Sequence, residues 1–67
     1  MKLTKHERDL IKAMCKNDLS ILATSRDLHY HRNTIVYQIQ QLRKKTGHDC
    51  RTFFGAARLL LLAMRED

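Results

Sequence analysis

The stretch Asp27–Leu42, DLHYHRNTIVYQIQQL, decides the fold because a polar cluster gives way within it to a periodic apolar pattern. Its apolar residues recur at i, i+4 and i+7, the spacing of one face of a helix: Ile35, Ile39 and Leu42. Gly47 follows at the place of a left-handed residue that ends a helix. The pattern predicts a helix that begins at His31 or Arg32 and ends at Thr46.

The angles of this helix separate a core direction from an outward face. At 100° per residue and with Ile35 at zero, Ile39 lies at about 40° and Leu42 at about −20°, which fixes the core direction. Seven other side chains then lie roughly between 60° and 200°, on one contiguous face without an acid. They are Arg32, Asn33, Val36, Tyr37, Gln40, Arg43 and Lys44.

The chemistry of that face suits double-stranded DNA. Asn33 and Gln40 carry the donor and acceptor pair that matches adenine, Arg32 can bracket guanine, and Val36 offers an apolar contact to a thymine methyl group. Phosphate contacts are expected from the rest of the face and from its edge: Tyr37, Thr34, Arg43 and Lys44. The alternative is a polar face that is simply solvated, as on many surface helices.

A short helix is predicted directly before this one. Ser20 or Asp18 can cap it, and its packing face consists of Ile21, Ser25 and Leu28. The turn His29–His31 is too short to cross a domain, so the two helices must meet at a sharp angle. This is the helix-turn-helix plan, in which the second helix lies in the major groove and its first residues read base edges.

One helix is predicted before this unit and one after it, which makes an all-α bundle of about four helices in a single domain, residues 1–67. Thr4 and Glu7 form a capping box that begins the first helix, which ends around Asn17-Asp18. Asp49 is expected to cap the last helix, from Cys50 to about Arg65. Its predicted core face comprises Phe53, Phe54, Ala57, Leu60, Leu61 and Met64.

The last helix carries more apolar surface than one stripe, because Leu59, Leu62 and Ala63 lie outside that face. A 67-residue chain has no second layer to cover such a helix, so we expect a partner. The predicted partner is a second copy of the chain, which makes a homodimer through Leu59 and Leu62. Central burial of this helix within the bundle is the alternative.

Composition narrows the class of partner. Thirteen Lys and Arg against seven Asp and Glu give a net charge of +6, which favours a polyanion. Two cysteines, no apolar leader and no long apolar run indicate neither export nor membrane insertion, so a cytoplasmic protein is expected. No cofactor is implied.

The motif His31-Arg32-Asn33-Thr34, followed by Tyr37, Thr46-Gly47 and the run Leu59–Ala63, resembles the C-terminal helix-turn-helix domain of the PucR and CdaR transcriptional regulators. The resemblance covers about residues 20–64, and a weaker likeness to Fis-type domains supports the same fold. It implies a bacterial-type transcriptional regulator that binds DNA, with contacts from five residues: His31, Arg32, Asn33, Thr34 and Tyr37.

The chain departs from that family pattern at several positions. Gln38 stands where the family usually has arginine, and Val36 where it often has a basic residue, so phosphate affinity and base preference are expected to differ. His29 stands where many such domains have glycine, and Ser25 replaces a small alanine. Tyr30 is expected to pack its ring in the core. The resemblance leaves open whether this is a stand-alone regulator or one domain of a longer chain.

Three other readings compete with DNA binding. His29 with His31, and His48 with Cys50, could form a zinc site, although the one-residue spacings are unusual for one. Cysteine, serine and histidine residues could form an enzyme site, but no nucleophile motif is present and a small helical chain leaves little room for a pocket. A module that binds another protein through the last helix is the strongest alternative; no enzyme activity and no metal are expected.

Overall fold

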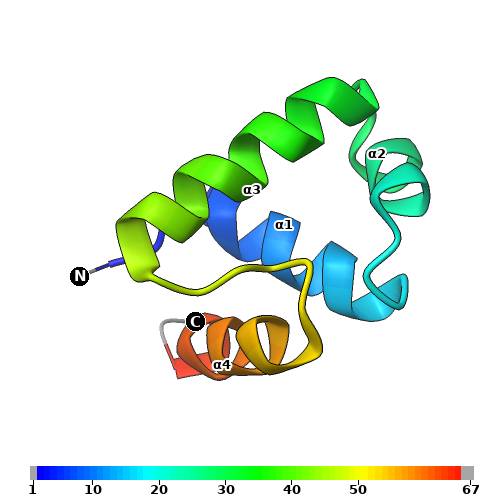
Figure 1. The fold of residues 1–67 in the computed structure, drawn as a ribbon. Helices are drawn as coiled ribbons and strands as arrows, with labels where there is room; N and C mark the ends of the chain where they lie inside the picture. Colours follow the sequence, from blue (N-terminus) through cyan, green and yellow to red (C-terminus); the bar gives the residue numbers. More distant parts are fainter. Residues whose placement is uncertain (1, 66–67) are drawn as a thin grey trace.

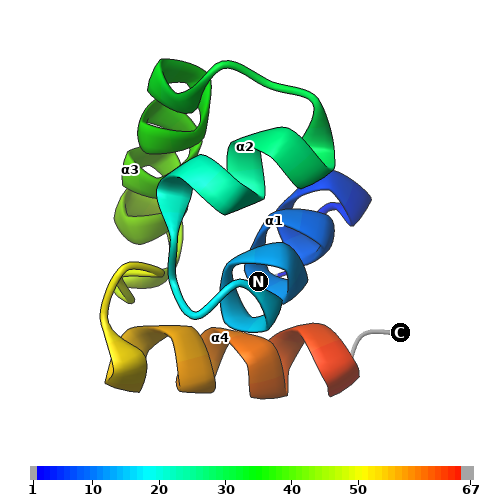
Figure 2. The same ribbon diagram turned by 90° about the vertical axis from the view of Figure 1, so that its right-hand side faces the viewer.

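The computed structural model describes residues 2–65, and these form four α-helices without a strand. The elements are α1 (Lys5–Lys16), α2 (Ile21–Leu28), α3 (Arg32–Thr46) and α4 (Phe53–Arg65). Helix α1 packs against both α2 and α4, and α2 packs against α3. Figure 1 shows α3 along the top of the molecule, and α4 lies along the base both there and in Figure 2. The predicted all-α bundle is confirmed.

Helix α1 begins as the sequence predicts. The Thr4 hydroxyl accepts a hydrogen bond from the Glu7 amide at 3.1 Å, and the Glu7 carboxylate accepts one from the Thr4 amide at 2.8 Å. Two otherwise unpaired amides of the first turn are thus satisfied. The helix buries its apolar side chains Leu10, Ile11 and Met14, which form the centre of the core.

The helix-turn-helix unit is formed by α2, the turn His29–His31 and α3. Ser20 is the residue that caps α2, because its hydroxyl accepts from the Ala23 amide at 3.1 Å. His29 ends α2 with φ +60°, a left-handed conformation that glycine adopts most easily and that histidine tolerates better than most residues. The Tyr30 amide then donates to the Ser25 carbonyl at 3.0 Å, and the chain turns sharply into α3.

The predicted apolar stripe of α3 is buried. Ile35, Ile39 and Leu42 are at most 2% exposed and lie in one cluster with the apolar side chains of α1. Gly47 ends α3 with φ +81°, and its amide donates to the Arg43 carbonyl at 2.7 Å. Ser25 is buried as expected, but the Tyr30 ring is 42% exposed and contacts the edge of His6, so its predicted core position is wrong.

Helix α4 differs from the prediction at its beginning. It starts at Phe53 instead of Cys50, and Thr52 takes the capping role because its hydroxyl accepts from the Gly55 amide at 3.0 Å. The predicted cap Asp49 instead accepts from the Arg51 amide in the preceding turn at 2.8 Å. Threonine and aspartate are both preferred at such positions, and the prediction considered only Asp49.

The predicted core face of α4 is wrong for most of its residues. The helix buries Gly55, Ala56, Leu59 and Ala63, whereas Phe53 is 83% and Phe54 70% exposed. At Gly55 a Cβ atom would lie 2.1 Å from the Asp49 carbonyl oxygen, so the first turn of α4 lies tightly against the turn that precedes it. The buried side of α4 consists of small residues and Leu59, and of the predicted face only Leu60 packs against the core.

This rotation corrects the predicted dimer contact. Leu59 is 0% exposed and belongs to the core, so it cannot meet another molecule. Leu62 is half-buried and packs against the same core. A contact between two copies through α4 therefore needs other residues of that helix.

Candidate nucleic-acid interface

The structure brings the predicted DNA-binding residues to the outward side of α3 and to its first cap. Seven of them are exposed: His31, Arg32, Asn33, Tyr37, Gln40, Arg43 and Lys44. Thr34 and Val36 are half-buried. This outward side, called the α3 face below, runs the length of a helix of 15 residues. A helix of that length spans about 22 Å, enough to cross a major groove about 12 Å wide.

The amino-terminal end of the α3 face is fixed by a side chain that was predicted to bind DNA. The Nδ1 atom of His31 accepts a hydrogen bond from the Asn33 amide at 3.1 Å and so caps α3. This contact holds the imidazole ring beside the first turn, where His31 remains exposed. The first turn contains no acid, so the positive end of the helix dipole adds to the attraction for a phosphate.

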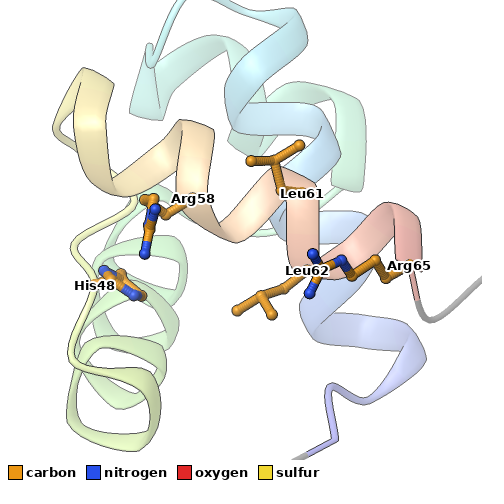
Figure 3. Close-up of a pocket in the computed structure, with 5 residues that line it drawn as sticks. All are labelled: His48, Arg58, Leu61, Leu62 and Arg65. Carbon is orange, nitrogen blue, oxygen red and sulfur yellow. The ribbon is translucent and has the colours of Figure 1, made fainter.

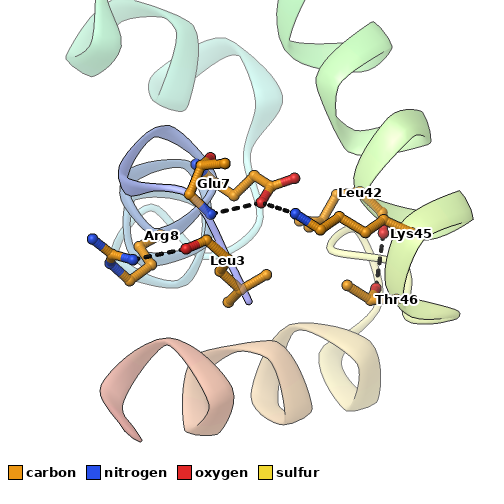
Figure 4. A network of polar contacts seen from close by, with 7 residues as sticks. Leu3, Glu7, Arg8, Leu42, Lys45 and Thr46 are labelled. Carbon is orange, nitrogen blue, oxygen red and sulfur yellow. Dashed lines mark hydrogen bonds and ion pairs between the residues drawn. The ribbon is translucent and has the colours of Figure 1, made fainter. Parts of the chain in front are cut away.

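The basic residues at the other end of α3 have different environments. Lys45 makes an ion pair with Glu7 of α1 at 2.8 Å, which ties the end of α3 to the beginning of α1 (Figure 4). Arg43 and Lys44 are exposed and have no carboxylate partner within residues 2–65. Together with Gln40 they line a shallow hollow on the α3 face. Lys45 therefore serves the fold, and its two neighbours are open to a polyanion.

Glu7 is held ionised by the same contacts. Partial burial by itself would raise the pKa of this carboxyl, but hydrogen bonds from Lys45 and Thr4 and the Lys45 charge outweigh burial and lower the pKa. The carboxylate is thus fully committed to α1 and to Lys45. It does not reduce the positive charge of the α3 face.

Charge is distributed unevenly along the chain. From Leu28 to Arg65 the sequence has a single carboxylate, Asp49, against seven lysines and arginines. That carboxylate accepts from the Arg51 amide and lies 3.7 Å from the Arg51 side chain. The part of the chain that contains α3 and α4 is therefore the more basic part, and its net positive charge attracts polyanions.

One departure from the family pattern loses its importance in the structure. Gln38 is half-buried and, at about 300° on the wheel that sets Ile35 at zero, lies on the inner side of α3. The residue at this position does not belong to the α3 face. Its replacement of arginine therefore leaves the outward chemistry of the helix unchanged.

The alternative zinc ligands do not come together. Within residues 2–65, no group of three or more histidine, cysteine, aspartate or glutamate side chains is placed to hold a metal ion. Cys50 is fully buried, and burial, with smaller effects of Cys15 and Asp49, raises the pKa of its thiol to about 12. Burial also raises the pKa of Cys15, whose sulfur lies 3.7 Å from the Ala56 carbonyl oxygen. Both thiols are protonated and unreactive near neutral pH.

Among the described residues, no helix has the length and apolar character needed to cross a membrane.

Two features of the structure were not predicted from the sequence. The prediction did not separate Lys45 from Arg43 and Lys44, because the ion pair joins residues 38 positions apart. It also placed the large apolar side chains of α4 inside the protein.

A short capped helix, a three-residue turn and a longer helix with an exposed, acid-free face define a helix-turn-helix domain. Comparison with known families makes this specific: the model of the PucR C-terminal helix-turn-helix domain matches residues 8–65. The chain belongs to that family, which is one of DNA-binding domains of transcriptional regulators.

One curated relative is the uncharacterized protein YxkF of Bacillus subtilis (strain 168). It is 27% identical to this chain over 60 residues, which cover 90% of this chain and 20% of the relative. The chain thus spans about a fifth of the length of the curated relative that it matches. No solved structure matches the chain.

Proposed function

We propose that this domain binds double-stranded DNA in a sequence-specific manner, with the α3 face in the major groove, and that it serves as the DNA-binding part of a transcriptional regulator. The observation that carries the proposal is the α3 face itself. It combines hydrogen-bonding groups for base edges with unpaired cations and no acid, on a helix whose other side is locked into the core. Such a regulator acts in the cytoplasm, with the DNA that it binds, and needs neither catalysis nor a cofactor.

Each part of the face has a role in this proposal. Arg32, Asn33 and Gln40 read base edges, and Val36 meets a thymine methyl group. The phosphates on either side are bound by the remaining members of the set, which fix the position of the helix: His31, Thr34, Tyr37, Arg43 and Lys44. The His31 cap supports this division, because it aligns the first turn of α3 before DNA arrives.

We further propose that the unit on DNA is a homodimer. A single α3 helix reads only a few base pairs, and helix-turn-helix proteins gain affinity by placing two recognition helices in successive major grooves about 34 Å apart. The outward apolar side chains of α4 support this view, since they leave a surface for a second molecule.

Selection of bound fragments from random double-stranded DNA tests the proposal. We expect one enriched motif, and we expect the logarithm of the affinity to fall linearly with the logarithm of salt concentration through counterion release. In Arg32→Ala and Asn33→Ala, discrimination against the wrong base should fall by about 1–3 kcal/mol at the affected position. No enrichment, or binding to a selected motif that both variants retain unchanged, would refute the docking of α3.

The competing function is a module that binds another protein and carries its basic surface incidentally. The apolar side of α4 is the specific observation that favours it. That reading predicts affinity for a protein without salt-dependent DNA binding, so the same salt titration separates the two.

A further inference from the structure

Helix α4 has an apolar stripe that is largely exposed. At 100° per residue its members fall within about 120° of the helix circumference; Ala57 and Leu60 are half-buried, and Leu60 also packs against the core. We call these six residues the outer α4 surface: Phe53, Phe54, Ala57, Leu60, Leu61 and Met64. The Leu61 and Met64 side chains are 60% and 62% exposed.

The amount of apolar surface is unusual for a domain of this size. Each phenylalanine ring presents an area on the order of 150–250 Å² when buried, and both rings are more than two-thirds exposed here. With Leu61, Met64 and the half-exposed residues, the stripe reaches roughly the 300–600 Å² that marks the largest patch of a monomer, which is often functional. The total is somewhat below the ~800 Å² per partner of a stable interface.

The two edges of the outer α4 surface differ in charge. Arg58 and Arg65 lie along one edge, and Arg58 also lies over the Phe54 ring, 5.7 Å from its centroid. Figure 3 shows them on either side of Leu61 and Leu62, with His48 facing Arg58, around a small hollow that no carboxylate lines.

The opposite edge is a second hollow, between α4 and the turn after α1. Its lining is mainly apolar, with one carboxylate from that turn: Cys15, Asp18, Leu19, Phe53, Ala56, Ala57 and Leu60. Asp18 is exposed and makes no ion pair within residues 2–65. One edge of the stripe is thus basic, and the other carries an unpaired acid.

We propose that the outer α4 surface binds the same surface of a second copy of this chain, with the two α4 helices side by side and parallel. The twofold axis runs along the pair of helices and relates each Phe53 to its counterpart. This proposal supplies the contact for the homodimer, and its choice of orientation rests in part on the proposed DNA binding.

Charge complementarity supports the parallel arrangement. Rotation about an axis parallel to α4 brings the basic edge of one molecule against the acidic edge of its partner, so Arg58 meets the region of the partner's Asp18. The levels agree, because residues 56, 57 and 60 of α4 line the hollow that contains Asp18. An antiparallel pair would instead place arginines against arginines and leave both Asp18 carboxylates unpaired.

The position of α3 supports the same arrangement independently. In Figure 2, α3 stands at the left over the amino-terminal end of α4, which runs from left to right along the base. A partner beneath α4 therefore does not cover the α3 face. With the axis along α4 both α3 helices lie at the same end of the dimer, where one duplex can reach them, whereas an antiparallel pair places them at opposite ends.

Single cysteines test the contact and its orientation together. In a Cys15→Ser background the remaining Cys50 is fully buried and should not react. Phe53→Cys and Met64→Cys lie 11 residues apart, about 16 Å along the helix, and a disulfide requires Cα atoms within about 7 Å. Under mild oxidation we expect each variant to crosslink to itself. Crosslinking only in a mixture of the two variants would mean an antiparallel pair and overturn the arrangement.

A matched control measures the crosslinking that results from chance collision. Leu22→Cys on α2 places a thiol at another exposed leucine, which is 50% exposed, and should crosslink no faster than chance encounter allows. If Phe53→Cys and Met64→Cys crosslink no faster than Leu22→Cys, the surface does not bind a second copy, and the proposal is wrong. That result would include the case in which another part of a longer chain covers the surface.

Sedimentation velocity of variants that carry no introduced cysteine measures self-association in a second way. Leu61→Glu should weaken self-association at least about tenfold, because it buries a carboxylate within the apolar contact, whereas Leu22→Glu should not. Binding to a DNA half-site should be the same for both variants. If the wild-type protein does not bind a DNA half-site, the proposed function is wrong. If Leu61→Glu self-associates as strongly as the wild type, this contact is wrong.

Discussion

Helices α3 and α4 are of similar length but use their apolar residues in opposite ways. Helix α3 buries its large aliphatic side chains and exposes hydrogen-bonding groups and cations. Helix α4 buries mainly small residues and exposes two phenylalanines, a leucine and a methionine. One bundle can thus present two kinds of surface, one suited to a polyanion and the other to an apolar partner. Which surface a helix presents depends on which of its sides packs against the core.

The largest expected effect separates two leucines of α4 that differ in burial. Leu59→Ala removes a side chain that is fully buried, and should lower the free energy of unfolding by about 2–5 kcal/mol. Leu61→Ala removes one that is 60% exposed and should change it by no more than about 0.5 kcal/mol. Denaturant unfolding followed by circular dichroism measures both. Equal losses, or a larger loss at Leu61, would show that α4 is rotated relative to this account.

The close approach of α4 can be tested at its glycine. Gly55→Ala introduces a Cβ atom 2.1 Å from the Asp49 carbonyl oxygen, so backbone must move, at a cost of about 1–3 kcal/mol. Gly47→Ala meets no atom within 4 Å and should cost only the left-handed conformation, about 1 kcal/mol. Thermal unfolding of the two variants should rank them in that order. A Gly55→Ala variant as stable as the wild type would contradict the tight contact between the first turn of α4 and the Asp49 backbone.

Two adjacent lysines of α3 allow a cation on the α3 face to be compared with one that stabilises the fold. Lys44→Gln should weaken binding to all DNA sequences alike and lower the salt dependence by about one phosphate contact. Lys45→Gln should leave that slope unchanged, because the lysine is already paired with Glu7. Fluorescence anisotropy across a series of salt concentrations gives both slopes. A greater change of the slope in Lys45→Gln would show that another side of α3 contacts DNA.

The smallest expected effect concerns pH and the Glu7–Lys45 ion pair. The pKa of Glu7 is lowered in the folded protein from its ordinary value of 4.5, so its ionised form stabilises the fold fully above pH 4.5. This contribution is lost as the pH falls through the lower folded pKa. Wild type should exceed Glu7→Gln by less than about 1 kcal/mol at pH 7 and lose that advantage in acid. An advantage that persists or grows in acid would contradict the assignment.

The sequence predicted the two helices of the helix-turn-helix unit well because the signals that orient and end α3 had one interpretation. One apolar stripe of three residues fixed the side of α3, and a glycine marked its end. Two apolar stripes on α4 left the choice of side to packing, and hydrophobicity favoured the larger residues. The tight contact between Gly55 and the Asp49 backbone at the start of α4 is likewise not revealed by periodicity. The pairing of Lys45 was equally hidden, because it depends on how α1 lies against α3.

The central claim is that the outward side of α3 reads DNA, and two neighbouring glutamines test it most directly. Gln40 and Gln41 are both exposed, but only Gln40 lies among the residues proposed to read base edges. Gln41 lies about 100° further around the helix, between Tyr37 and Thr34, where only phosphate contacts are proposed. Affinities of Gln40→Ala and Gln41→Ala should be measured on the selected DNA site and on single-base variants of it. Gln40→Ala should lose affinity and discrimination at one base pair, while Gln41→Ala should discriminate between bases as the wild type does. Equal loss of discrimination in the two variants, or a larger loss for Gln41→Ala, would contradict the reading of bases by this side of α3.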